Sequence, residues 1–270
     1  IQTIAFMNSI SVLAPAFGPL FGAFILQWSD WRTIFTILAV WAMFPLLLLY
    51  WDMPETAPIQ QGELKLSSSL SSYYKIITNG RFMTYMLASR MIFPAMIIWL
   101  SAGPFLLSDR FHMDDYHFGL AQVFVFGMYI VGTKLNTWLL SRYALHTLLW
   151  QGWGWALMGS LYLMISANLR PDWFYLTLPG LMMITFGAGI SLPIYSRLAI
   201  EQSSEPMGTK VAMTTFSMTL FGALATVIVN VFFNNSLPSL ATTLSGCILS
   251  GFLLFFINTT FIYKDLRSMK

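Results

Sequence analysis

Residues 14–23 read Ala-Pro-Ala-Phe-Gly-Pro-Leu-Phe-Gly-Ala and lie inside a hydrophobic stretch that covers residues 2–27. Two prolines and two glycines within eight residues would break a helix in water. In a bilayer, neighbouring helices can satisfy the backbone groups that the prolines free. Gly18 and Gly22, one helical turn apart, would also let another backbone approach closely. The stretch therefore predicts a membrane helix that packs against a close neighbour.

The composition of the whole chain is that of a polytopic membrane protein. Hydrophobic residues make up 57% and charged residues 9%, and the mean hydropathy is +0.67. The net charge of +3 is small and its basic residues are dispersed, so no nucleic-acid partner is expected. Cys247 is the only cysteine, and the three histidines are far apart in sequence, so we expect no disulfide, metal or cofactor.

Eight apolar stretches of about 20 residues are long enough to cross roughly 30 Å of hydrocarbon. They cover residues 2–27, 31–51, 82–107, 117–140, 147–167, 173–196, 209–233 and 239–262. The longest polar segment, 52–80, separates the second stretch from the third. Within it, Leu66, Leu70, Tyr73 and Ile77 recur at helical spacing, which fits either an interfacial helix or a solvated linker.

The distribution of lysine and arginine over the connections predicts the orientation. If residue 1 starts on the cytoplasmic side, nine basic residues fall inside: Lys65, Lys75, Arg81, Arg142, Arg197, Lys210, Lys264, Arg267 and Lys270. Only three fall outside, namely Arg32, Arg110 and Arg170. Both ends of the chain and the 52–80 segment are therefore expected in the cytoplasm.

The small residues of the first stretch resemble the antiporter motif of drug:proton antiporters in the major facilitator superfamily, G-x8-G-x3-G-P-x2-G-G. The matching positions are Ala5, Ala14, Gly18, Pro19, Gly22 and Ala23. Alanine replaces glycine at three of them, which resembles the Bcr/CflA and MdfA-like branch of multidrug efflux proteins. In addition, Met53-Pro54-Glu55-Thr56 is similar to the Pro-Glu-Thr that follows helix 6 in many family members.

The resemblance implies an all-α polytopic membrane protein with the major facilitator fold, of whose twelve transmembrane helices eight are present. Residues 1–51 would be the last two helices of the N-terminal bundle, 52–80 the central cytoplasmic loop, and 81–270 the C-terminal six-helix bundle. The other partners of this segment would be the lipid bilayer and the missing N-terminal helices of the same chain. By the same resemblance, residues 14–23 would pack on helix 8, seal the outer side of the cavity and pivot during transport; tight packing alone is the alternative.

Only Arg90 and Lys134 are ionisable residues well inside a predicted stretch, where a charge is costly unless it faces a polar cavity or a partner. Arg90 shares a helical face with Met86, Phe93 and Ile97. Lys134 shares a face of another helix with Gly127, Val131 and Trp138. We expect these faces to line the central cavity. Alternatively, each long side chain could extend to the headgroups or hold a carboxylate on another helix.

On the first helix, Asn8, Ser11 and Pro15 would form one small polar stripe. The resemblance implies that this stripe borders the drug pocket, while hydrogen bonding to the backbone or to a neighbour is the alternative. Two later helices carry residues that interrupt regular helix and so could bend during gating. These residues are Pro94 and Pro104 in one, and Gly187, Gly189 and Pro193 in the other.

The resemblance predicts secondary active export of drugs or small amphipathic compounds by alternating access, with a small-molecule substrate and protons as partners, in a bacterial inner membrane. No Asp or Glu lies deep in any stretch, so the coupling carboxylate is expected outside this sequence. The two buried cations leave export of an anionic metabolite or siderophore open. A non-transporting scaffold or sensor is a second alternative. Without a cluster of catalytic side chains or a phosphate-binding loop, an enzyme is not expected.

Overall fold

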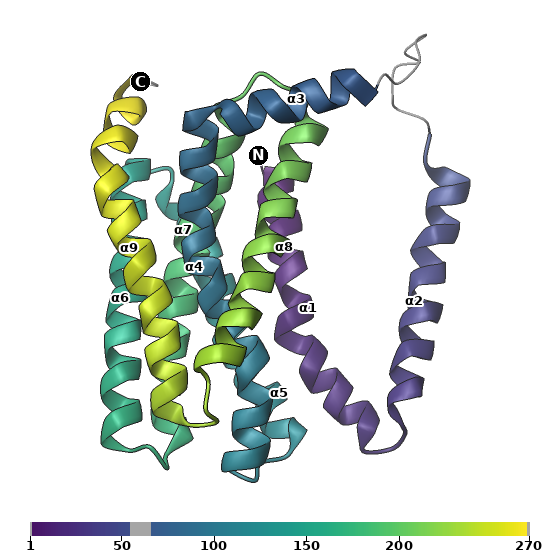
Figure 1. The fold of residues 1–270 in the computed structure, drawn as a ribbon. Helices are drawn as coiled ribbons and strands as arrows, with labels where there is room; N and C mark the ends of the chain where they lie inside the picture. Colours follow the sequence, from purple (N-terminus) through teal and green to yellow (C-terminus); the bar gives the residue numbers. More distant parts are fainter. Residues whose placement is uncertain (1, 55–65, 269–270) are drawn as a thin grey trace.

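The computed structural model describes the backbone of residues 2–54 and 66–268, and the side chains of residues 14–54 and 70–257. The described residues form helices and connections without any strand, which confirms the all-α class (Figure 1). The helices are α1 (Gln2–Leu26), α2 (Trp31–Asp52), α3 (Leu66–Thr78), α4 (Gly80–Phe105), α5 (Asp115–Leu139), α6 (Leu145–Leu169), α7 (Leu178–Glu201), α8 (Met207–Phe232) and α9 (Leu237–Ser268). A π-helical turn, η1 (Leu106–Arg110), follows α4, and a 3-10 turn, η2 (Phe174–Leu176), precedes α7.

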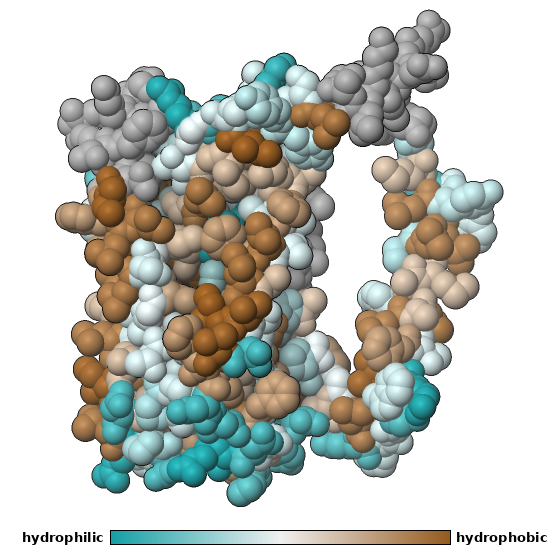
Figure 2. Space-filling model, viewed as in Figure 1, coloured by the Kyte–Doolittle hydropathy of each residue, from teal (hydrophilic) through white to brown (hydrophobic). Residues whose placement is uncertain are grey.

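Each of the eight predicted stretches corresponds to one long helix. Helix α9 continues six residues past its predicted end. Helix α7 begins five residues later than predicted, at Leu178, because Pro179 occupies its first turn and the residues before it form η2. Six helices of the described chain are long and apolar enough to cross a membrane. The 25-residue α6 is long enough, but Gln151 and repeated glycines and tryptophans lower its hydropathy. Figure 2 shows apolar side chains over the middle of the molecule and polar ones gathered toward its lower end.

The core is a bundle in which α7 packs against α4, α5 and α6. Two glycines of α7 lie very close to the backbone of its neighbours. A Cβ added at Gly189 would lie 2.3 Å from the carbonyl oxygen of Tyr129 in α5, and one at Gly187 would lie 2.3 Å from the carbonyl oxygen of Gly152 in α6. These glycines, which the sequence suggested as points of bending, are therefore the contacts that hold α7 between its two neighbours.

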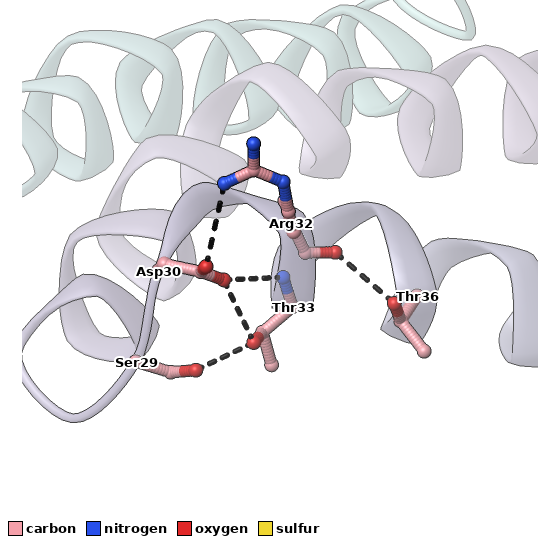
Figure 3. A network of polar contacts seen from close by, with 5 residues as sticks. All are labelled: Ser29, Asp30, Arg32, Thr33 and Thr36. Atoms are coloured by element: carbon pink, nitrogen blue, oxygen red, sulfur yellow. Dashed lines mark hydrogen bonds and ion pairs between the residues drawn. The ribbon is translucent and has the colours of Figure 1, made fainter.

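The first two helices differ sharply in their contacts. Helix α1 packs along α5, whereas α2 has no buried residue and contacts α1 only weakly (Figure 1). The turn between them is held by Asp30, whose carboxylate accepts a hydrogen bond from the backbone N–H of Thr33 and so caps α2 (Figure 3). Ser29 shares a hydrogen bond with the Thr33 hydroxyl, and Arg32 lies 3.7 Å from the Asp30 carboxylate.

Of the two alternatives for the 52–80 segment, the structure shows a helix, α3, which lies across one end of the bundle (Figure 1). Ile76 of α3 is buried, and Lys75 Nζ of the same helix lies 3.4 Å from the Glu205 carboxylate in the α7–α8 connection. Asn79 joins α3 to α4: its side-chain oxygen caps α4, and its amide donates to the carbonyl of Gln202. The start of α1 and the end of α9 lie toward this same end.

Candidate functional site: a cavity among five helices

A cavity of about 350 Å³ lies among α1, α4, α5, α7 and α8. Its lining is mainly apolar, and the polar groups are those of Arg90, Tyr129 and Ser196. The other lining residues are Pro15, Phe93, Met96, Ile97, Leu100, Phe126, Leu192, Pro193 and Met218. An apolar space with a few polar groups is the usual form of a binding site for a small organic molecule.

Helix α4 supplies the largest share of the lining, because Arg90, Phe93 and Ile97 repeat at helical spacing and project from one face. The same face meets α8. At Gly222 an added Cβ would lie 3.5 Å from Phe93 and 3.8 Å from Ile97, so the α4 side chains lie against the backbone of α8. The position of α8 therefore depends on the residues that line the cavity.

Arg90 is a buried cation at the junction of α4 and α8, with only 4% of its surface exposed. Its Nε donates a hydrogen bond of 3.0 Å to Ser217 Oγ of α8. The Ser217 hydroxyl in turn donates to the backbone carbonyl of Thr214, 2.7 Å away. Among the residues whose side chains the structure describes, no carboxylate forms an ion pair with Arg90.

The opposite wall comes from α5 and α7, whose spacing is fixed by direct backbone contacts. Thr133 of α5 donates to the carbonyl of Tyr129 in its own helix at 3.0 Å and lies 3.3 Å from that of Gly189 in α7. Pro193 follows Gly189 by one turn and reaches the cavity. The close contact at Gly189 therefore determines the position of the α5 and α7 side of the cavity.

Pro15 is the residue of α1 that lines the cavity. The close contact between α1 and α5 lies five residues further along α1, at Leu20. A Cβ added at Gly119 of α5 would lie only 2.6 Å from the Cα of Leu20. By contrast, no described atom comes within 4 Å of a Cβ built at Gly18 or Gly22. The glycine that permits the close approach of α1 and α5 is thus on α5 and outside the motif.

Of the residues predicted to line a cavity, the structure brings together Pro15, Arg90, Phe93 and Ile97. Met86 is buried one turn before Arg90 but does not line the space, and Lys134 is exposed on α5. The side chains of Asn8, Ser11 and Ala5 lie outside the described residues. Of the remaining motif positions, Ala23 is buried, Pro19 and Gly22 are half-buried, and Ala14 and Gly18 are exposed.

Sequence reasoning did not find the contributions of α5, α7 and α8, including Phe126, Tyr129, Ser196 and Met218. These are residue types that occur throughout membrane helices, so only Pro193 carried a signal. The described residues contain no group of three or more His, Cys, Asp or Glu that could hold a metal ion.

The fold and the site together define a polytopic membrane protein with a mainly apolar cavity between its helices. Residues 1–226 match the profile of the Major Facilitator Superfamily, and the chain belongs to this family. Members of this family are membrane transporters and not enzymes, in agreement with the sequence analysis.

Comparison with curated proteins places the chain near multidrug efflux members of the family. It is 30% identical over 223 residues to the multidrug transporter MdfA of Escherichia coli O6:H1, an alignment that covers 82% of this chain and 54% of the relative. It is 29% identical over 225 residues to the chloramphenicol resistance protein CraA of Acinetobacter baumannii, covering 83% and 54%. The resemblance to the MdfA-like branch is therefore confirmed. The chain spans about half the length of these relatives.

Proposed function

We propose that the chain is part of a secondary active exporter that moves drugs or other small amphipathic compounds out of the cell. The observation that carries this proposal is the cavity of about 350 Å³, which is apolar over most of its wall and is lined by five helices. Its volume falls in the range of sites for drug-sized ligands, roughly 300–1,000 Å³. The names of the relatives, a multidrug transporter and a chloramphenicol resistance protein, support this substrate class.

The proposed mechanism is alternating access, in which two helical bundles rock about a central site. Residues 81–270, with α4 to α9, would form one bundle, and residues 1–51 would belong to the other through α1 and α2. The lining of the cavity by Pro15 of α1 together with residues of α4, α5, α7 and α8 supports this division. Residues 14–23 would act as the outer seal, and the contact between Leu20 and Gly119 would be the point about which α1 moves.

Proton coupling is the proposed source of energy. Of the eleven Asp and Glu residues of the sequence, the nine in the described backbone fall in the connections or at helix ends, and Glu55 and Glu63 belong to the polar segment 52–80. A carboxylate that exchanges protons inside the membrane would therefore come from helices that this sequence does not contain. For the orientation, the distribution of Lys and Arg supports a cytoplasmic location of both ends and of α3, in a bacterial inner membrane.

The cavity can be tested by filling it. Phe126 lines the cavity, whereas Phe124 on the same helix is 51% exposed. The full-length protein is expressed in a strain without its own drug exporters, and accumulation of chloramphenicol is measured. Phe126→Trp should raise accumulation toward that of cells without the protein, while Phe124→Trp should export like the wild type. Equal export by both variants at equal expression would refute this cavity as the substrate site.

Proton coupling is tested in inverted vesicles that hold the full-length protein. Chloramphenicol uptake should stop when a protonophore collapses the pH gradient. In separate vesicles without protonophore or respiration, an imposed pH gradient should drive uptake. Uptake that persists without a proton gradient would contradict the proposed coupling while leaving export itself in place.

A further inference from the structure

The buried arginine of the cavity has more hydrogen-bond donors than the described protein uses. A guanidinium carries five N–H donors and keeps its charge at any physiological pH. In Arg90 the Nε–H is directed to Ser217 Oγ, 3.0 Å away, and no described carboxylate neutralises the charge. A single hydroxyl can orient the guanidinium but cannot balance its charge, and an unbalanced charge at this depth is costly.

The hydrogen bond to Ser217 also determines which edge of the guanidinium remains for a ligand. Because Nε is engaged by α8, the two Nη groups remain as the pair that can bind a planar anion in a forked arrangement. Ser217 is itself held by its bond to the Thr214 carbonyl, so the orientation of the fork is tied to the backbone of α8. Arg90 lines the cavity, so a ligand there can reach this group.

We infer that the cavity prefers amphipathic compounds that carry one carboxylate, and that Arg90, positioned by Ser217, binds this group. This inference rests on the proposed function only in taking the cavity to be the substrate site. The aromatic and aliphatic walls, among them Phe93, Ile97 and Phe126, would hold the apolar body of the compound. One charge is expected because the described lining contains one cation, so a dianion would leave a buried charge without a partner.

The alternative is that Arg90 pairs with a carboxylate of the protein outside the described residues. The two arrangements predict opposite ligand preferences. A guanidinium already neutralised by the protein would gain little from a ligand carboxylate, because the pair would have to be broken. An unpaired guanidinium should favour a carboxylate over the corresponding neutral amide by about tenfold or more.

The test compares naphthalene-2-carboxylate with naphthalene-2-carboxamide, which differ in charge but hardly in size. Binding of each is measured by calorimetry on the full-length protein in lipid nanodiscs. The wild type should bind the carboxylate at least about tenfold more tightly. Arg90→Gln should abolish this ratio without weakening amide binding, and Arg90→Lys, which lacks the fork, should retain only part of it. The matched control is Arg81→Gln, which removes a charge from an exposed position of the same helix and should leave the ratio unchanged.

Ser217→Ala tests the positioning role. It should lower the carboxylate-to-amide ratio several-fold with amide binding unchanged, a result that a loss of packing alone would not give. The inference is overturned if the wild type binds both compounds equally, binds neither, or keeps its preference in Arg90→Gln. Chloramphenicol export by the same protein is followed in parallel. If chloramphenicol is exported but the carboxylate and the amide bind equally, this inference fails and the proposed function stands. If chloramphenicol is not exported, the proposed function fails.

Discussion

The contact between α1 and α5 gives a sharp prediction for the substitution Gly119→Ala. The new Cβ would lie 2.6 Å from the Cα of Leu20 and 2.9 Å from its backbone nitrogen. Backbone atoms cannot rotate out of the way as the end of a side chain can. To restore an ordinary carbon–carbon distance of about 3.6 Å, α1 would have to move by about 1 Å. Overpacking of this kind costs about 1–3 kcal/mol.

A second glycine of α5 provides the control. At Gly127 no described atom lies within 4 Å of an added Cβ, so Gly127→Ala changes the same helix without a clash. Both substitutions gain the same helix propensity, up to about 1 kcal/mol. The difference between the two variants therefore isolates the cost of the contact at Leu20.

The assay is heating of the full-length protein in detergent, followed by size-exclusion chromatography to measure the fraction that remains monodisperse. Gly119→Ala should lose its native peak about 2–10 °C below Gly127→Ala, which is the shift that corresponds to about 1–3 kcal/mol. If the two variants melt together, α1 is not held against α5 at this distance in the assembled protein, and the reasoning is wrong.

Two further predictions concern contacts outside the cavity. The carboxylate of Glu205 accepts a hydrogen bond from Ser72 and pairs with Lys75, and these interactions lower its pKa from the ordinary value of 4.5. The resulting stabilisation is present above that value and lost as the pH falls through the lowered pKa. The protection factors of the α3 amides, which correct for the slower intrinsic exchange in acid, should therefore fall as the pH is lowered. Glu205→Gln should lower the protection of α3 already at pH 7. Wild-type α3 protection that is the same in acid and at pH 7 would contradict the prediction. In the core, Trp153 Nε1 donates a 2.9 Å hydrogen bond to Tyr195 Oη, so Tyr195→Phe should lower stability by about 1 kcal/mol. The same substitution in a Trp153→Phe background should cost clearly less; an equal cost in both backgrounds would show that the bond contributes nothing.

The eight long helices follow directly from the sequence, because the length of an apolar run is set by membrane thickness and not by its neighbours. The spacing of Leu66, Leu70, Tyr73 and Ile77 indicated a helix at α3 but left a solvated linker as the alternative. The least accurate boundaries were those of α7 and α9. The predicted stretch at α7 included Trp173, whereas Pro179 fixes the first turn, and α9 continues to Ser268, beyond the predicted end at residue 262. Boundaries depend on capping and proline geometry, which hydropathy does not record.

For the cavity, the sequence supplied the residues that stand out chemically. Arg90 was conspicuous as a charge in an apolar run, and Pro15 and Pro193 as prolines inside helices. Residues such as Met96 and Phe126 could not be distinguished from those that face lipid, because an all-round apolar helix has no polar face to indicate its orientation. Their place in the site became visible only when the neighbouring helices were in position.

The sequence by itself determined the class of protein, the number and length of its long helices and the depth of Arg90, since each depends on local hydropathy and chain length. Only the tertiary structure decided which surfaces meet. It placed the close approach of α1 at Gly119 and gave Gly187 and Gly189 a packing role. It also joined Arg90 to Ser217, which is 127 residues away in the chain. Helix packing depends on the shapes of two surfaces at once, and a single helix carries only one of them.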